Sequence, residues 1–456
     1  MKLIEDIRRL AERYLPQGSL RARFASGTLW VTVGFALAQA LTLLASIINA
    51  RFLGKAGFGE LGMVLNTIGA FGVLAGMSLS SAATRYVAEL KVKDPDRAGR
   101  IIALCTSTAM VSGGGVALLV LLFAPHLARH VMNAAWLAPH VRVASLLLFI
   151  NALNGAQNGA LSGFEAFRTA AKANLLKGLL GFPFMITGVY WWGLTGALWG
   201  NVVASAAGWL VFHIALREES KKAGIVVRYH NLRGELPMLW RFSVPAVLSG
   251  FFITPITWLA NVMLVHQRDG YSEMGLFNAA NQWRTFLSFV PGIISATALP
   301  MLSETLNNNR QRSMRKIFLT GVGVSAVFVL SQALVLSTIS PWIMSRYGPS
   351  FRNGWLVLIF CLVGGAILGI QTSGTTLIIA AGKMWASFFL NLAWAAVFLA
   401  MVALLVGRGA LGLSIAYAAS YVVHCVSTFV VAYYAVIQRK PKVSATQSPP
   451  PEDLCR

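Results

Sequence analysis

Long apolar segments separated by short polar ones dominate this chain of 456 residues. Hydrophobic residues make up 56% of the sequence and charged residues only 12%, and the mean hydropathy is +0.65. Inside lipid, segments of this kind satisfy their backbone hydrogen bonds as helices. The sequence therefore predicts an all-α integral membrane protein. This composition excludes a soluble enzyme.

Twelve apolar stretches are long enough to be transmembrane helices. The predicted spans are residues 26–50, 58–84, 99–124, 139–163, 172–191, 193–216, 238–265, 272–303, 314–339, 352–380, 384–406 and 409–436. The expected organisation is an N-terminal cytoplasmic segment (1–25), a first lobe of six helices (26–216), a cytoplasmic linker (217–237), a second lobe of six helices (238–437) and a disordered cytoplasmic tail (438–456).

Two short motifs recur at nearly constant separation. Residues 57–63 (Gly-Phe-Gly-Glu-Leu-Gly-Met) return as residues 270–276 (Gly-Tyr-Ser-Glu-Met-Gly-Leu), and residues 193–196 (Gly-Leu-Thr-Gly) return as residues 409–412 (Gly-Ala-Leu-Gly). Paired halves of this kind build transporters whose central site opens to either side of the membrane. We therefore expect two pseudo-symmetric lobes around a central cavity.

The basic residues set the expected orientation. The formal net charge is +22, and most of the 38 Lys and Arg residues fall on one side if the N-terminus is cytoplasmic. This asymmetry predicts that both termini of a multi-pass membrane protein are cytoplasmic. The partners of these cations are then membrane lipids, and no nucleic-acid partner is expected.

Arg284 is the clearest candidate for a functional charge inside the membrane. It lies about a dozen residues into the eighth predicted span, near mid-bilayer at ~1.5 Å per residue, and in a hydrated cavity its guanidinium would pair with a phosphate or carboxylate. The alternative is an arginine that snorkels along a tilted helix or bonds to carbonyl groups. Asn278, Asn281 and Gln282 lie within about one turn of it and would bind sugar hydroxyls, or simply bridge helices.

Other polar residues suggest a wet cavity. Asn151, Asn154 and Asn158 follow one helical stripe of the fourth span. Gln39 and Asn66 in the first two spans are weaker candidates for substrate binding.

Prolines and glycines suggest bends and close contacts. Pro245 and Pro255 interrupt the seventh span and Pro291-Gly292 the eighth, as hinges beside a transport site or as structural kinks. Close helix packing is expected at three pairs of glycines: Gly72 with Gly76, Gly196 with Gly200, and Gly365 with Gly369.

The acidic residues narrow the substrate class. All sixteen Asp and Glu residues map to loops, tails or helix ends. A transporter of organic cations normally has a buried carboxylate in its pore, and because none is expected here, an anionic cargo is favoured. The histidines at 126, 130 and 140 have no acidic ligand nearby, and no phosphate-binding loop or nucleophile elbow is present. The sequence predicts a transporter that is not an enzyme, with no metal and no cofactor.

At several motifs the chain resembles the polysaccharide-biosynthesis (Wzx-type) oligosaccharide flippases of the multidrug/oligosaccharidyl-lipid/polysaccharide exporter superfamily. The motifs are residues 51–54 (Arg-Phe-Leu-Gly) leading to 57–59 (Gly-Phe-Gly), then 76–89 (Gly-Met-Ser-Leu-Ser-Ser-Ala-Ala-Thr-Arg-Tyr-Val-Ala-Glu), 242–245 (Phe-Ser-Val-Pro) and 275–280 (Gly-Leu-Phe-Asn-Ala-Ala).

The resemblance implies a flippase that moves an undecaprenyl-pyrophosphate-linked oligosaccharide to the outer leaflet by alternating access, for O-antigen, capsule or exopolysaccharide assembly. It makes Arg284 a partner of the pyrophosphate or an acidic sugar, places Arg85 or Lys177 at a cytoplasmic entrance, and makes polysaccharide polymerase machinery a candidate partner. Three alternatives stay open: a lipid II flippase or multidrug exporter of the same superfamily, a membrane glycosyltransferase or ligase acting on polyprenyl-linked glycans, and a scaffold for the polymerase.

Overall fold

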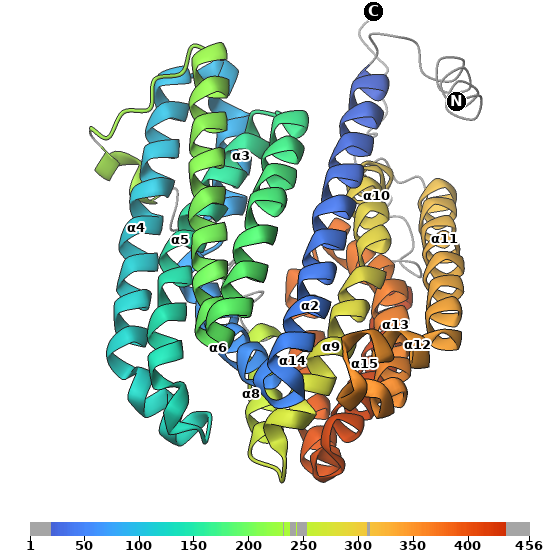
Figure 1. Ribbon diagram of the computed structural model, residues 1–456. Helices are drawn as coiled ribbons and strands as arrows, with labels where there is room; N and C mark the ends of the chain where they lie inside the picture. Colours follow the sequence, from blue (N-terminus) through green and yellow to red (C-terminus); the bar gives the residue numbers. More distant parts are fainter. Residues whose placement is uncertain (1–19, 231, 238–242, 244–252, 308–310, 435–456) are drawn as a thin grey trace, which may run out of the picture.

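The structure, a computed structural model, describes residues 20–230, 232–237, 243, 253–307 and 311–434. Within these ranges every regular element is a helix, which confirms the all-α prediction (Figure 1). The helices of the first half are α2 (Leu20–Gly76), α3 (Leu79–Lys93), α4 (Pro95–His126), α5 (Ala138–Gly163) and α6 (Phe167–Lys222).

The second half repeats this pattern with more breaks. Its helices are α8 (Ile253–Val265), α9 (Gly270–Leu287), α10 (Phe289–Asn307), α11 (Gln311–Thr338), α12 (Ser340–Tyr347), α13 (Trp355–Ala380), α14 (Met384–Leu405) and α15 (Gly409–Ala432). Short 3-10 or π-helical turns complete the connections: η1 (Leu127–Val131), η2 (Ala135–Leu137), η3 (Leu232–Glu235), η4 (Pro349–Gly354) and η5 (Val406–Arg408).

Two helices are too long for one membrane crossing. α2 has 57 residues and α6 has 56, so each would extend ~85 Å if straight, against a hydrocarbon core of ~30 Å. Both bend instead: α2 at Gly54, and α6 at Trp192 and Gly193. Each therefore supplies two of the predicted spans, which we call its first and second arms. The count of twelve spans stays a prediction, because part of the seventh lies outside the described residues.

One predicted boundary is wrong. The second span ends at Gly76, before the predicted boundary at residue 84, because Met77 and Ser78 adopt left-handed backbone conformations before α3 begins. The eighth span is broken at Ser288, between α9 and α10, in the turn before Pro291. A proline cannot bond to the carbonyl four residues earlier and its ring crowds that carbonyl, so a break at this place agrees with the predicted interruption at Pro291-Gly292.

Close glycine packing occurs at two of the three predicted pairs. A Cβ atom at Gly200 would lie 2.6 Å from the Phe184 carbonyl oxygen, and one at Gly365 would lie 2.8 Å from Cγ of Arg284. At the third pair the prediction is wrong, since a Cβ at Gly76 would meet nothing within 4 Å.

The second sequence repeat has the same backbone conformation in both halves. Gly193 has φ 55° and ψ −131°, and Gly409 has φ 68° and ψ −145°. Only glycine adopts these angles without strain. Each glycine begins the last long helical segment of its half, the second arm of α6 and α15.

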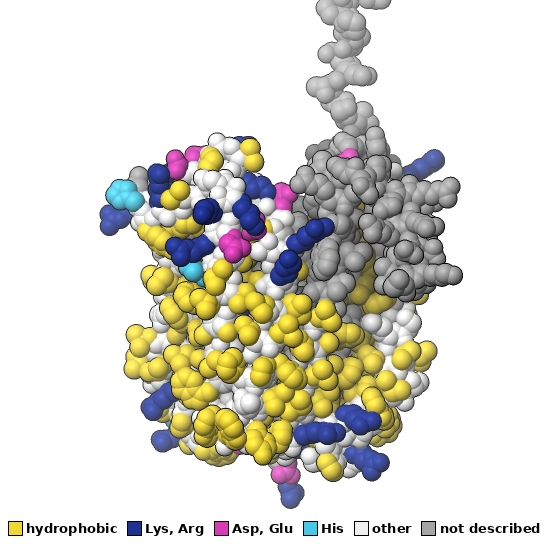
Figure 2. All heavy atoms as spheres, turned by 45° about the horizontal axis from the view of Figure 1, so that its top comes forward, with side chains coloured by type: hydrophobic (Ala, Val, Ile, Leu, Met, Phe, Trp, Pro, Cys, Tyr) yellow, Lys and Arg dark blue, Asp and Glu magenta, His cyan; other side chains and the backbone are white. Residues whose placement is uncertain are grey.

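The helices form two bundles that come together at the lower end of the molecule in Figure 1, where α2 bends. On the face of the molecule shown in Figure 2, hydrophobic side chains form a broad belt, and charged side chains gather above and below it. Within the described residues, eight helical segments are long and apolar enough to cross a membrane. Large exposed apolar side chains such as Leu122 and Leu334 are explained by contact with lipid.

Candidate functional site

The two halves meet through the first sequence repeat. A Cβ atom at Gly59 in α2 would overlap the carbonyl oxygen of Tyr271 in α9, and one at Gly275 would overlap the carbonyl oxygen of Lys55. Glycines at these positions let the backbones of α2 and α9 touch. The repeated motif is therefore the contact between the halves, with one copy on each side.

Polar contacts close the same end of the molecule. The ammonium of Lys55 lies 3.3 Å from the carboxylate of Glu273, which also accepts a 2.8 Å hydrogen bond from the backbone N–H of Ala410. The hydroxyl of Tyr271 donates to the carbonyl oxygen of Met132 at 2.6 Å. The first and last of these contacts join the two halves, and the bond to Ala410 holds α9 against α15 within the second half. Polar contacts therefore close this end of the molecule.

A cavity of about 240 Å³ lies between the halves beside this contact. It is lined by Thr42, Ser46, Asn49, Phe58, Leu61, Gly62, Leu65 and Asn66 of α2, Met185 and Asn201 of α6, and Asn278, Asn281 and Gln282 of α9. Side-chain amides dominate its polar lining, and none of these residues is charged. We call it the amide pocket.

The amide pocket holds polar atoms without partners in the protein. Asn66 donates to the Oδ1 atom of Asn278 at 3.3 Å, but four other buried atoms of lining residues make no hydrogen bond: Ser46 Oγ, Asn49 Oδ1, Asn278 Nδ2 and Gln282 Oε1. Leaving such a group unpaired costs ~1–3 kcal/mol. The pocket therefore suits water or a ligand rich in groups that both donate and accept hydrogen bonds.

Arg284 lies behind this pocket, within the second half. Its Nε donates to Oδ1 of Asn281 at 2.6 Å, and its guanidinium carbon lies 4.8 Å from the ring centre of Tyr417 on α15. Its side chain also bonds to Tyr421 and packs against Gly365. No carboxylate of the described residues forms an ion pair with Arg284, so Asn281 connects an uncompensated cation to the amide pocket.

The other sequence candidates lie elsewhere. The stripe on the fourth span is divided: Asn151 is exposed, Asn154 is buried and donates to the Ser205 carbonyl oxygen at 3.1 Å, and Asn158 is half-buried. None of the three lines the amide pocket, and neither does Gln39 in the first arm of α2.

The entrance and hinge candidates are dispersed along the chain. Arg85 is exposed on α3 and lies over the ring of Tyr86, whereas the stem of Lys177 packs against Gly208 between the two arms of α6. Pro255 is the third described residue of α8, and Gly292 follows Pro291 in α10. Pro245 lies outside the described residues.

Several pocket residues were not singled out by the sequence. Asn201, Ser46 and Thr42 join the four predicted amides of residues 66, 278, 281 and 282. Asn201 follows Gly200, and its amide bonds to the carbonyl of Ala197 in its own helix at 2.8 Å. Only the close approach of α6 to α2, which local patterns do not reveal, brings Asn201 to the site.

A repeated Gln–His pair was also missed. The side-chain amide of Gln157 lies 3.4 Å from Nδ1 of His213, and the amide nitrogen of Gln371 lies 3.1 Å from Nδ1 of His424. The members of the second pair follow those of the first at almost the separation of the glycine motifs. Extending that register along the sequence would have revealed the pair.

Comparisons with known proteins extend the resemblance. The chain is 25% identical over 297 residues to the EPS I polysaccharide export inner membrane protein EpsE of Ralstonia nicotianae, covering 62% of this chain and 64% of the relative. It is 24% identical over 289 residues to the lipid III flippase of Escherichia coli, covering 61% and 67%. The match thus spans less than two thirds of EpsE.

Solved structures share the fold. An inward-facing multidrug resistance MATE family transporter of the MOP superfamily superposes with a TM-score of 0.72 at 17% identity, covering 89% of this chain and 98% of that one. The lipid II flippase MurJ, in an inward closed conformation, superposes with a TM-score of 0.70 at 12% identity, covering 88% and 87%. Residues 24–306 match the family described as polysaccharide biosynthesis protein. With more than half of its length matched, this chain belongs to the polysaccharide biosynthesis protein family.

Proposed function

We propose that this protein is a flippase that carries a polyprenyl-pyrophosphate-linked oligosaccharide from the inner to the outer leaflet of the bacterial inner membrane. The observation that carries the proposal is the amide pocket between the halves, with four buried polar atoms that lack a protein partner. Its family and the polysaccharide export and lipid III flippase names of its relatives support the same class of cargo.

The pocket chemistry fits a saccharide. Each sugar hydroxyl donates and accepts hydrogen bonds, and each side-chain amide offers both kinds of group. The absence of a carboxylate from the pocket lining disfavours a cationic drug as cargo. Family membership and the pocket together favour a transporter over a glycosyltransferase.

In this mechanism Arg284 compensates the negative charge of the pyrophosphate. A diphosphate that enters beside Asn281 would take the Nε–H bond that Asn281 now accepts, and would gain a charge-assisted partner. Tyr417 and Tyr421 hold the guanidinium in place meanwhile. The polyprenyl chain stays in lipid while the head group crosses between the halves.

Alternating access requires the contact between α2 and α9 to open. The glycines and the Lys55–Glu273 pair that seal it would separate as the bundles rock, while contacts at the opposite end form. Coupling to a proton or sodium gradient is left open, because no acidic residue lies in the pocket lining.

The test is leaflet exchange of a defined polyprenyl-pyrophosphate oligosaccharide in proteoliposomes. Asn201→Leu removes a pocket amide whose own hydrogen bond lies within its helix. It should slow exchange at least about tenfold, because losing a polar contact to the cargo costs ~1.4 kcal/mol. Asn174→Leu is the matched control, since Asn174 makes the same kind of bond to Ala170 at 2.9 Å on the same helix but does not line the pocket. Equal effects of the two variants would contradict the proposal.

Arg284 is tested in the same assay. Arg284→Ala should abolish exchange while the purified protein keeps its melting temperature within a few degrees, and Arg284→Lys should retain part of the activity because it keeps the charge. Full activity of Arg284→Ala would remove this residue from the mechanism. Exchange of lipid II at the same rate as the oligosaccharide lipid would instead support the lipid II alternative.

A further inference from the structure

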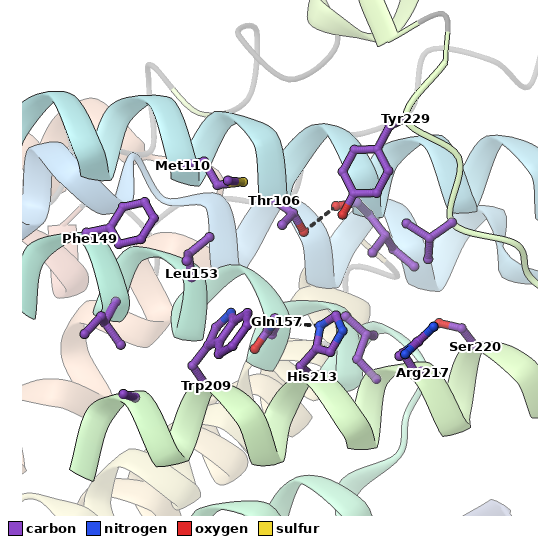
Figure 3. A pocket seen from close by; sticks show the side chains of 15 residues that line it. Thr106, Met110, Phe149, Leu153, Gln157, Trp209, His213, Arg217, Ser220 and Tyr229 are labelled. Carbon is purple, nitrogen blue, oxygen red and sulfur yellow. Dashed lines mark hydrogen bonds between the residues drawn. The ribbon is translucent and has the colours of Figure 1, made fainter. Parts of the chain in front are cut away.

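A second, larger cavity of about 580 Å³ lies entirely within the first half (Figure 3). It is enclosed by α4, α5, the second arm of α6 and the segment that follows α6, and it shares no lining residue with the amide pocket. Nothing in the proposed translocation mechanism uses it. Its volume is within the ~300–1,000 Å³ typical of small-molecule sites.

The lining changes from polar to apolar along the cavity. Arg217, Ser220 and Tyr229 line one end, and Met110 and Phe149 line the other. Arg217 is five residues from the end of α6, ~8 Å along the axis, whereas Met110 is fifteen residues into α4, ~22 Å. The polar end is therefore at the depth of lipid head groups and the apolar end near the middle of the membrane.

The polar end of the cavity carries a cationic side chain and a buried hydroxyl group without a hydrogen-bond partner. Figure 3 shows His213 and Arg217 one turn apart on the face of α6 that points into the cavity. Ser220 is only 4% exposed, and its Oγ atom has no hydrogen-bond partner. None of the residues that line the cavity has a carboxylate. Glu219, which precedes Ser220 on α6, is engaged by Thr169 at 3.0 Å and Lys222 at 2.8 Å.

The equivalent Gln–His pair of the second half differs in how far its histidine is buried. Gln157 and Gln371 are both buried, and each histidine stacks on an indole ring: His213 on Trp209 at 5.5 Å and His424 on Trp394 at 5.9 Å. His424 is 7% exposed, whereas His213 is half-buried and lines the cavity. The first half therefore leaves its histidine more accessible than the second half does.

We propose that this cavity binds a membrane phospholipid with an anionic head group. The phosphate lies between Arg217 and Ser220, whose hydroxyl donates to it, and one acyl chain follows Leu153, Phe149 and Met110 toward the middle of the bilayer. An arginine beside an otherwise unpaired buried hydroxyl supplies two donors to one phosphate. The lipid fixes the α4–α5–α6 bundle and plays no part as cargo.

The experiment measures lipid binding to the purified full-length protein by native mass spectrometry, with phosphatidylglycerol and phosphatidylcholine as probes. The wild type should bind one phosphatidylglycerol about tenfold more tightly than phosphatidylcholine. Arg217→Gln should remove most of this preference, and Ser220→Ala should weaken phosphatidylglycerol binding several-fold. Met110→Trp, which fills the apolar end, should weaken binding of both lipids.

Lys221→Gln is the matched control, because Lys221 is an exposed cation on the same turn of α6 that does not line the cavity. It should leave phosphatidylglycerol binding unchanged, and all variants should melt within a few degrees of the wild type in zwitterionic lipid. Equal losses in Arg217→Gln and Lys221→Gln would show a diffuse surface charge in place of a site and overturn the proposal. Displacement of phosphatidylglycerol by an equimolar polyprenyl phosphate would overturn it in favour of a carrier-lipid site.

Discussion

At the scale of single residues, the repeated motif has acquired different roles in its two copies. Glu60 in α2 accepts a 2.9 Å hydrogen bond from the indole N–H of Trp136, and its counterpart Glu273 in α9 pairs with Lys55 and caps Ala410 at the start of α15. The side chains of Lys55 and Glu273 are 24% and 25% exposed. Their pair is thus partly shielded from water and joins the two halves.

A double-mutant cycle should measure this link. Lys55→Met and Glu273→Gln, combined, should show a coupling energy of about 1 kcal/mol in the free energy of unfolding, because the pair is only partly screened by solvent. Denaturation by detergent titration provides the measurement. The pair Lys91–Glu165, which lies within the first half and whose Glu165 side chain is 60% exposed, serves as the control: its coupling energy in the same measurement should be smaller, because water screens it more. A coupling energy near zero at Lys55–Glu273 would mean that the ion pair does not hold the halves together and that the contact of α2 with α9 at Gly59 and Gly275 does so alone.

The sequence predicted part of the site at this scale. Asn66, Asn278, Asn281 and Gln282 were identified because amides in apolar spans are unusual enough to detect locally. The environment of Arg284 was not predictable, because Tyr417 and Tyr421 come from a helix more than a hundred residues further along. The stripe on the fourth span failed as a pocket predictor because helical spacing shows that residues share a face and does not show which neighbour that face meets.

At the scale of helices, glycine position decides where backbones touch and where they bend. Gly59 and Gly275 bring α2 against α9, and Gly54, Gly193 and Gly409 supply the positive φ angles at bends and helix starts. The repeats predicted paired halves from sequence alone. The break in the eighth span lies in the turn before Pro291, because a proline disrupts helical bonding to the residue four positions earlier.

Gly59→Ala should weaken the contact between α2 and α9. The added methyl group would overlap a backbone carbonyl that cannot rotate away, which should cost ~1–3 kcal/mol of stability and favour separation of the halves. Gly69→Ala is the control on the same helix, since its methyl group would meet nothing within 4 Å, and alanine stabilises a helix by ~0.5–1 kcal/mol relative to glycine. Melting temperatures should therefore move in opposite directions. A fall of equal size in both variants would contradict the packing argument.

At the scale of the whole molecule, the contacts between the halves are concentrated at one end. Lys55 and Gly59 follow the bend of α2 at Gly54 and contact Glu273, Tyr271 and Gly275 of α9. Figure 1 shows that α2 bends at the lower end of the molecule, where the bundles come together. The distribution of basic residues predicts that this end faces outward. With this predicted orientation, the proposed flippase would be closed to the outside here, the state in which it would receive cargo from the inner leaflet.

Site-directed labelling tests this orientation. In a background without native cysteines, Ser350→Cys in η4 should react with a membrane-impermeant maleimide in intact inner-membrane spheroplasts, because Ser350 is exposed at the end predicted to be external. Ala223→Cys, exposed just beyond α6, should react only after the membrane is permeabilised. The two sites serve as controls for each other's reactivity, since both are exposed and should react equally in detergent. The reverse labelling pattern would contradict the predicted orientation and place the contact between α2 and α9 on the cytoplasmic side. The conformation described here would then be the one that releases cargo to the outside.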